Sequence, residues 1–135
     1  MKKFDNFVSN LAVLSTARQQ DLSNEFILSG IADKFALQFE LSWKLLKSLL
    51  QYEGDPLGST GSPREILKGS YRCFGFVDEE LWLSMLRDRN TLERSYDQEE
   101  LRRIIDLILD RYIPAFEALR VSIEERYGED LDTLS

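Results

Sequence analysis

One continuous helical segment, residues 25 to 52, restricts the fold of this chain more than any other part of the sequence. Apolar side chains occur almost all round this helix, and the usual rise per residue makes it about 40 Å long. A helix with so little polar surface needs cover on several sides. Either a central position in a monomeric bundle or contact with a partner subunit supplies that cover. Its polar residues form one narrow face, which consists of Asp33, Glu40, Lys44, Lys47 and Gln51.

Apolar residues that recur every three or four positions predict four more helices, and no segment alternates as a strand would. Ser62, Pro63 and Glu65 form the pattern of a capping box, which predicts a helix that starts there. Because glycine favours helix ends, this helix is expected to end before Gly75. The two helices that follow have one aspartate each as their expected N-cap, Asp78 and Asp97.

The remaining segments complete a prediction of the fold class. Residues 2 to 19 are expected to form the first helix, and the glycine-rich residues 53 to 62 a loop. Pro114 lies inside the last predicted helix and is expected to kink it. We therefore predict an all-α fold, an antiparallel up-and-down bundle of about five helices. Residues 1–127 would form its single domain and residues 128–135 a flexible C-terminal tail.

The chain is acidic, since 17 lysines and arginines against 24 aspartates and glutamates leave a net charge of −7. Proteins that bind nucleic acid regardless of sequence present a basic surface, so general DNA binding is not expected. Residues 87 to 103, however, contain five arginines and five acids. This locally neutral region favours a phosphate more than the rest of the acidic chain does.

The chain contains no histidine and a single cysteine, Cys73, which we interpret as a small buried filler. Without an imidazole the chain lacks the side chain that most often transfers protons near neutral pH. Metal-ligand spacings are also missing, so we expect neither a metal site nor a cofactor. One thiol cannot form an internal disulfide, and no stretch approaches the roughly 20 apolar residues of a membrane span. These features favour a cytoplasmic protein without a membrane segment.

The segment WLSMLRDRNTLERSYD, residues 82 to 97, begins as an amphipathic helix and ends in charged and hydroxyl side chains. Its apolar stripe runs from Trp82 directly into Arg89, because residues three, four and seven apart share a helix face. Arg89 therefore interrupts a stripe that should remain apolar. A structural interpretation pairs Arg89 with Glu93 one turn on, or with an acid on a neighbouring helix. The functional interpretation places Arg89 in a binding site.

Three sequence blocks, FELSWKLLK at 39–47, SPREILK at 62–68 and RNTLERSYD at 89–97, resemble the nucleotidyltransferase substrate-binding protein family. This family is one branch of the HEPN domains. The resemblance implies a helical bundle that forms a homodimer in the cytoplasm of a prokaryote. It also implies a complex with a minimal nucleotidyltransferase, in which this chain is the nucleotide- or substrate-binding subunit. Many such pairs behave as toxin–antitoxin modules whose HEPN member is a metal-independent ribonuclease.

The ribonuclease members of this superfamily carry an arginine, a histidine four to six residues later and often a tyrosine two residues beyond. Arg89, followed by Asn90, matches the arginine and Tyr96 the tyrosine, but Arg94 stands in the position of the histidine. Arg94 cannot accept a proton, although it could stabilise phosphate charge. The resemblance thus favours nucleotide or RNA phosphate binding by Arg89, Asn90, Arg94 and Tyr96. The alternative is a degenerate ribonuclease whose catalytic residues are Arg89 and Arg94.

In such pairs the tyrosine of the motif can accept AMP groups from the nucleotidyltransferase. Tyr96 is the corresponding residue here. Its structural interpretation is a tyrosine at a helix junction, with a packed ring and a hydroxyl bonded to Asp97 or to the backbone. The resemblance implies the first interpretation of Tyr96, and the residues around it support the second.

Overall fold

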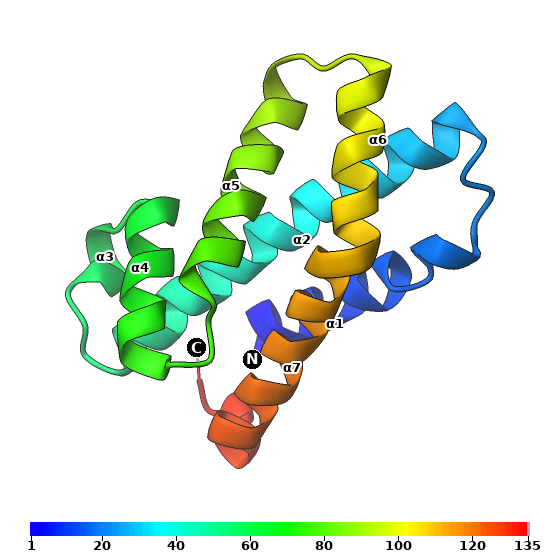
Figure 1. Cartoon of the computed structure of the whole chain (residues 1–135). Coiled ribbons are helices and arrows are strands. Elements are labelled where there is room, and N and C mark those ends of the chain that lie inside the picture. The colour runs from blue at the N-terminus through cyan, green and yellow to red at the C-terminus, as the bar shows by residue number, and fades with distance from the viewer. Residues whose placement is uncertain (135) are drawn as a thin grey trace.

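The computed structural model describes residues 1–134, and over this range the chain is helical without any strand, which confirms the predicted all-α bundle (Figure 1). A π-helical turn, Ile108–Tyr112, separates the last two helices, and short 3-10 turns occur at Ala17–Gln19 and Gly128–Asp132. The α-helices are α1 (Lys2–Leu14), α2 (Glu25–Tyr52), α3 (Leu57–Thr60), α4 (Pro63–Phe74), α5 (Glu79–Arg94), α6 (Gln98–Leu107) and α7 (Ile113–Tyr127).

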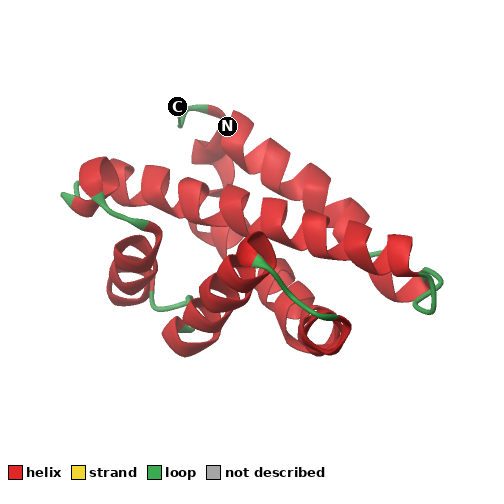
Figure 2. Ribbon diagram, turned by 90° about the horizontal axis from the view of Figure 1, so that it is seen from above, coloured by secondary structure: helices red, strands yellow, loops and turns green. Residues whose placement is uncertain are grey.

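Helix α2 is the central element of the fold, and α1, α3, α4, α5 and α6 all pack against it. It extends along the whole molecule in Figure 2. Its inward side chains form the middle of the core, where the ring of Phe35 stacks on that of Tyr112 with centroids 5.3 Å apart. The monomer does not cover all of its apolar surface, however. Phe26 is 89% exposed and Leu37 is 46% exposed.

The capping signals in the sequence predict the helix ends correctly. Ser62 accepts the backbone N–H of Glu65, and the Glu65 carboxylate accepts the backbone N–H of Ser62. The carboxylates of Asp78 and Asp97 cap α5 and α6, and each accepts the backbone N–H of the residue three positions on, without the reciprocal bond. Gly75 ends α4 with a φ of +75°, in the left-handed region that glycine adopts without strain.

Two local predictions differ from the structure. The segment 53–62 contains the four-residue helix α3, where the sequence predicted only loop. Gly58 lies in this turn because a side-chain carbon there would collide with the backbone of Gln51 on α2. The first helix ends at Leu14, and the hydroxyl of Thr16 bonds to the carbonyl of Val13 where the predicted helix would have continued.

The predicted kink at Pro114 takes the form of a π-helical turn immediately before it. In a regular α-helix, the proline ring would clash with the carbonyl of Asp110 and would leave it without a donor. The wider turn at Ile108–Tyr112 separates α6 from α7 and brings Tyr112 into the core.

The segment after Gly128, for which a flexible tail was predicted, begins as a 3-10 turn over Gly128–Asp132. Leu131 is 9% exposed and Leu134 is 8% exposed, and both belong to the core cluster. This segment therefore adds apolar contacts near the end of α7.

Candidate functional site

Arg89, the residue that interrupts the apolar stripe of α5, lies between α5 and α2 with its side chain 13% exposed. Its guanidinium donates to a carboxylate oxygen of Glu40 at 2.8 Å and more loosely to Glu93 at 3.4 Å. The same guanidinium lies over the ring of Phe39, 5.3 Å from its centroid. The structural interpretation is thus confirmed, because Arg89 pairs both with Glu93 and with an acid on a neighbouring helix.

The carboxylate of Glu40 interacts with two groups besides Arg89. The oxygen that accepts Arg89 also accepts the indole N–H of Trp43 at 2.9 Å, and the other oxygen lies 3.7 Å from the ammonium of Lys44. The Nε of Arg89 is buried and has no hydrogen-bond partner among the described residues. Both carboxylate bonds of Arg89 come from one guanidinium nitrogen, Nη1, so a phosphate that bound this nitrogen would have to compete with Glu40.

The other three predicted site residues lie at the exposed junction between α5 and α6. Asn90 and Arg94 are exposed and four residues apart, so they share a face of α5. Tyr96 is 39% exposed in the connection to α6. Within residues 1–134 these three side chains form no hydrogen bond or ion pair. Arg94 projects about 140° round the helix from Arg89, so the structure divides the predicted site in two.

The sequence did not predict the burial of Asp88, which is 0% exposed. Its two carboxylate oxygens accept the Tyr112 hydroxyl and, at 3.2 Å, a guanidinium nitrogen of Arg103. Ser84 bonds to the Tyr112 oxygen at 3.0 Å, so the network joins α5 to the π turn. A buried tyrosine hydroxyl needs a partner, so a tyrosine at an apolar position of the last predicted helix, Tyr112, was the sequence signal for this network.

Burial raises the pKa of Tyr112 to about 12, and the hydrogen bond to negatively charged Asp88 acts in the same direction. The phenol therefore remains protonated and donates to Asp88 at neutral pH. A group that holds its proton so firmly is a poor general base, and we assign this network to the packing of α5 against the π turn.

Other groups offer little chemistry for catalysis. Within the described range, no three His, Cys, Asp or Glu side chains are grouped as metal ligands. Cys73 is half-buried, and burial, with a smaller effect from the charge of Glu53, raises the pKa of its thiol.

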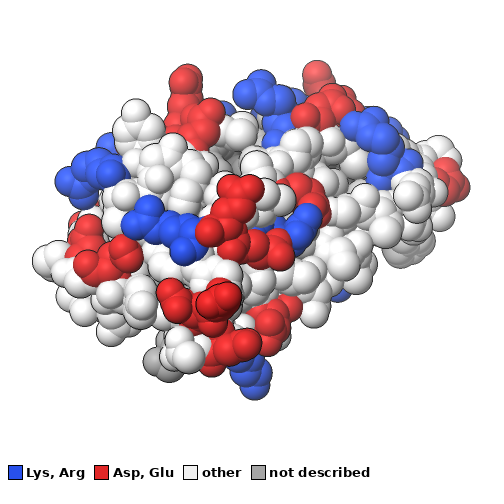
Figure 3. All heavy atoms as spheres, turned by 90° about the horizontal axis from the view of Figure 1, so that it is seen from below, with Lys and Arg blue, Asp and Glu red and all other residues white. Residues whose placement is uncertain are grey.

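On the face that Figure 3 shows, acidic side chains gather in the middle and basic ones lie between and around them. None of the helices over residues 1–134 has the length and apolar character needed to cross a membrane.

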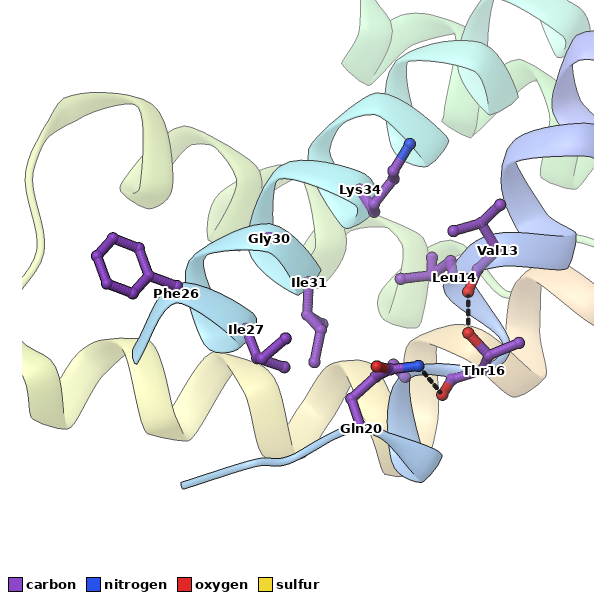
Figure 4. A pocket seen from close by; sticks show the side chains of 10 residues that line it. Val13, Leu14, Thr16, Gln20, Phe26, Ile27, Gly30, Ile31 and Lys34 are labelled. Atoms are coloured by element: carbon purple, nitrogen blue, oxygen red, sulfur yellow. Dashed lines mark hydrogen bonds between the residues drawn. The ribbon is translucent and has the colours of Figure 1, made fainter. Parts of the chain in front are cut away.

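An apolar hollow of about 290 Å³ lies between the end of α1 and the start of α2. Figure 4 shows Ile27 and Ile31 directed toward this hollow, whereas the ring of Phe26 points away from them. Val13 is 52% exposed on its other wall. Exposed apolar surface thus extends over both sides of the first turns of α2, a pattern that marks interaction surfaces.

Comparison with known proteins shows similarity over nearly the whole chain. The model of the family described as "Nucleotidyltransferase substrate binding protein like" matches residues 2–125, from α1 almost to the end of α7. The chain is also 30% identical over 96 residues to the "Probable ribonuclease HepT" of Haemophilus influenzae. That match covers 68% of this chain and 64% of the relative, so it spans less than two thirds of the relative's length. On the family match, this chain belongs to the nucleotidyltransferase substrate-binding-protein-like family.

Proposed function

We propose that this chain is the non-catalytic nucleotide- or substrate-binding subunit of a complex with a minimal nucleotidyltransferase. In this proposal, the two proteins form a toxin–antitoxin-like module in the cytoplasm of a prokaryote, and this chain is the HEPN member of the module. The observation that carries the proposal is Arg94, which is exposed and forms no ion pair within residues 1–134, in the position of the ribonuclease histidine. A guanidinium there binds phosphate oxygens but transfers no proton.

The α5–α6 junction is the phosphate-binding part of this subunit. Arg94 supplies the charge, the amide of Asn90 adds a donor on the same helix face, and Tyr96 offers an exposed ring and hydroxyl. The carbonyls at the end of a helix repel anions, so affinity here depends on the Arg94 side chain. The Nη1 of Arg89 contributes only when the ligand displaces Glu40 from it.

Titration with ATP, followed by amide NMR shifts, tests this assignment. Arg94→Gln should weaken binding about tenfold, because it removes charge-assisted hydrogen bonds to phosphate. Arg111→Gln is the matched control, since Arg111 is another exposed arginine without an ion pair in the described part of the chain. Equal affinity in the unmodified protein and Arg94→Gln would contradict the assignment.

The ribonuclease alternative needs Arg89 and Arg94 to act on the same phosphate. The ion pairs that hold Arg89 and the angle between the two side chains weigh against it. A metal-free RNA cleavage assay that compares the unmodified chain with Arg89→Ala decides this point. Cleavage by the unmodified chain alone would favour the alternative over a binding subunit.

We also propose that Tyr96 accepts AMP from the nucleotidyltransferase. Its 39% exposure and the lack of any side-chain hydrogen bond within residues 1–134 support this role over that of a packed junction tyrosine. After incubation with partner and ATP, the intact mass should rise by one AMP group. An increment that persists in Tyr96→Phe would exclude this residue as the acceptor.

The exposed face of α2 is the surface on which two copies of this chain form the homodimer. Phe26 and Leu37 are eleven residues apart, about three helical turns, and therefore lie on one face. Two α2 helices can pair antiparallel in a register that places Asp33 of each copy opposite Lys34 of the other. This register brings together two pairs of opposite charges. The same register sets Gly30 opposite Leu37 of the second copy.

Gly30 supports this arrangement independently. Apart from its two chain neighbours and the backbone of its own helical turns, a side-chain carbon at Gly30 would meet no described atom within 4 Å, so packing inside the monomer does not require glycine. Glycine inside a helix costs about 0.5–1 kcal/mol relative to alanine. Close approach of a second α2 would explain its presence.

Size-exclusion chromatography with light scattering tests the dimer. Phe26→Lys should convert it to a monomer with an unchanged circular dichroism spectrum, because a charge would be buried at the contact. Val121→Lys is the control, since Val121 is an exposed apolar residue on α7. A monomeric unmodified protein at high micromolar concentration would contradict the proposal.

A further inference from the structure

The outer face of α4 carries a line of basic side chains in an otherwise acidic protein. Arg64, Lys68 and Arg72 are four residues apart, so they share one helix face, and all three are exposed. Neither Arg64 nor Arg72 has an ion pair among the described residues. Lys68 makes only a loose contact with Glu79, at 3.8 Å. Glu65, the one acid of this helix, is committed to its capping box.

A concave surface lies beside this basic line. A hollow of about 440 Å³ is lined by Leu57 of α3, by Lys68, Tyr71 and Arg72 of α4, and also by the two acids that Lys68 and the capping box engage, Glu79 and Glu65. A second hollow, of about 480 Å³, shares Leu57 and Arg72 with it and has Asp55 as its one acidic lining residue. Arg72 therefore stands between two hollows and can reach a ligand in either.

Tyr71 gives this face an aromatic group next to its charges. Its side chain is 49% exposed, and its hydroxyl forms no hydrogen bond in the part of the chain that the structure describes. An exposed ring between cations matches the chemistry of a nucleotide, whose base stacks on aromatic faces while its phosphate pairs with arginine. An exposed basic helix that serves only solubility would not need this ring beside a hollow.

We propose that the α4 face, formed by Arg64, Lys68, Tyr71 and Arg72, is a second nucleotide-binding site. Its ligand is a phosphate with an attached base, supplied either as a free nucleotide or as a unit of single-stranded nucleic acid. The site is separate from the α5–α6 junction, because α4 packs at the beginning of α5 and Arg94 ends that helix. The sixteen residues of α5 extend over about 24 Å.

Binding of a fluorescently labelled single-stranded RNA, followed by anisotropy at several salt concentrations, tests the proposal. The double variant Arg64→Gln/Arg72→Gln should bind at least about tenfold more weakly than the unmodified chain. Its plot of log affinity against log salt should also become shallower by about 1.4, since each single-strand phosphate contact contributes about 0.7. Tyr71→Ala should weaken binding without a change in the salt slope.

The control is Arg87→Gln/Arg111→Gln, which removes the same charge from exposed arginines on other helices. It should retain the affinity of the unmodified chain. Arg94→Gln measures the junction site separately, so failure of one site does not hide the other. Circular dichroism and thermal unfolding check that each variant folds.

Competition by unlabelled AMP distinguishes the two sources of the ligand. If AMP displaces the RNA, the site accepts a free nucleotide, and if only longer strands displace it, the site binds single-stranded nucleic acid. Either result supports the proposal when the α4 variant is impaired. Two results overturn it: no RNA binding by the unmodified chain at low salt, or equal losses in the α4 and control variants.

Discussion

Arg89 and Glu40 form a 2.8 Å ion pair that joins α5 to the middle of α2. The two residues are 49 positions apart in the sequence. The pair lies next to the apolar core, over the ring of Phe39, and the Trp43 indole fixes the same carboxylate oxygen. Arg89 is thus a structural cation whose partner occupies the place that a ligand anion would take.

The stability of the fold should depend on Arg89 more than on Arg94. Arg89→Met removes the hydrogen bonds to Glu40 and Glu93 and should lower the free energy of unfolding by about 2 kcal/mol. Arg94→Met, at an exposed position, should change it by less than about 0.5 kcal/mol. Urea unfolding monitored by circular dichroism measures both values. Equal effects would show that the ion pair contributes nothing specific.

Removal of the competing carboxylate should make Arg89 available to phosphate. Glu40→Gln keeps the shape of the side chain and an acceptor oxygen but removes its charge, so ATP affinity should rise up to about tenfold. The gain should disappear in Glu40→Gln/Arg89→Met. Calorimetric titration of the two variants measures this difference. An unchanged affinity in Glu40→Gln would mean that Arg89 does not contact the ligand.

Stability should fall at alkaline pH because two buried phenols hold their protons. Burial raises the pKa of Tyr112 and of Tyr127 to about 12 each, against about 10 in an unfolded chain. The native state therefore binds protons that the unfolded state has already released. The stabilisation is complete below pH 10 and is lost as the pH rises from about 10 to about 12.

Urea unfolding at several pH values in this range measures the effect. The loss should be on the order of 2 kcal/mol for each tyrosine. Tyr112→Phe should be less stable than the unmodified chain at neutral pH, since Asp88 loses a donor, but its stability should decline less above pH 10. Parallel declines in the two proteins would contradict the assignment.

The segment after α7 should contribute to stability. Leu131→Ala and Leu134→Ala each remove apolar contacts from the edge of the core and should cost about 1–2 kcal/mol. Asp132→Ala, at an exposed position between them, is the control. Thermal unfolding distinguishes this result from the flexible tail that the sequence predicted, for which all three variants would be equally stable.

Features determined by neighbours in the sequence were predicted well. Helix α2 spans Glu25–Tyr52, the range that the sequence predicted, because the apolar pattern is a local signal; Asn24 caps its first turn. The capping box at Ser62 and the end of α4 at Gly75 were also predicted correctly, because each depends on residues within one helical turn. The helix α3 was missed, since Gly58 serves close approach to α2, and the sequence does not distinguish this use of glycine from a flexible loop.

The candidate site was predicted less completely because its geometry depends on contacts between distant segments. Asp88 lies between two arginines in the sequence, and only the packing of Tyr112, 24 residues later, explains its burial. The sequence correctly offered an acid on a neighbouring helix as a partner of Arg89, but it did not identify Glu40. It also grouped Arg89 with Arg94, although a helix directs the two side chains to different faces.

Coexpression of this chain with a minimal nucleotidyltransferase from the same genome tests the central claim most directly. Size-exclusion chromatography with light scattering would then measure the mass of the eluted species at micromolar concentration. The proposed role as a binding subunit predicts one peak that contains both proteins in a fixed ratio. Clean separation of the two proteins at that concentration would contradict the role.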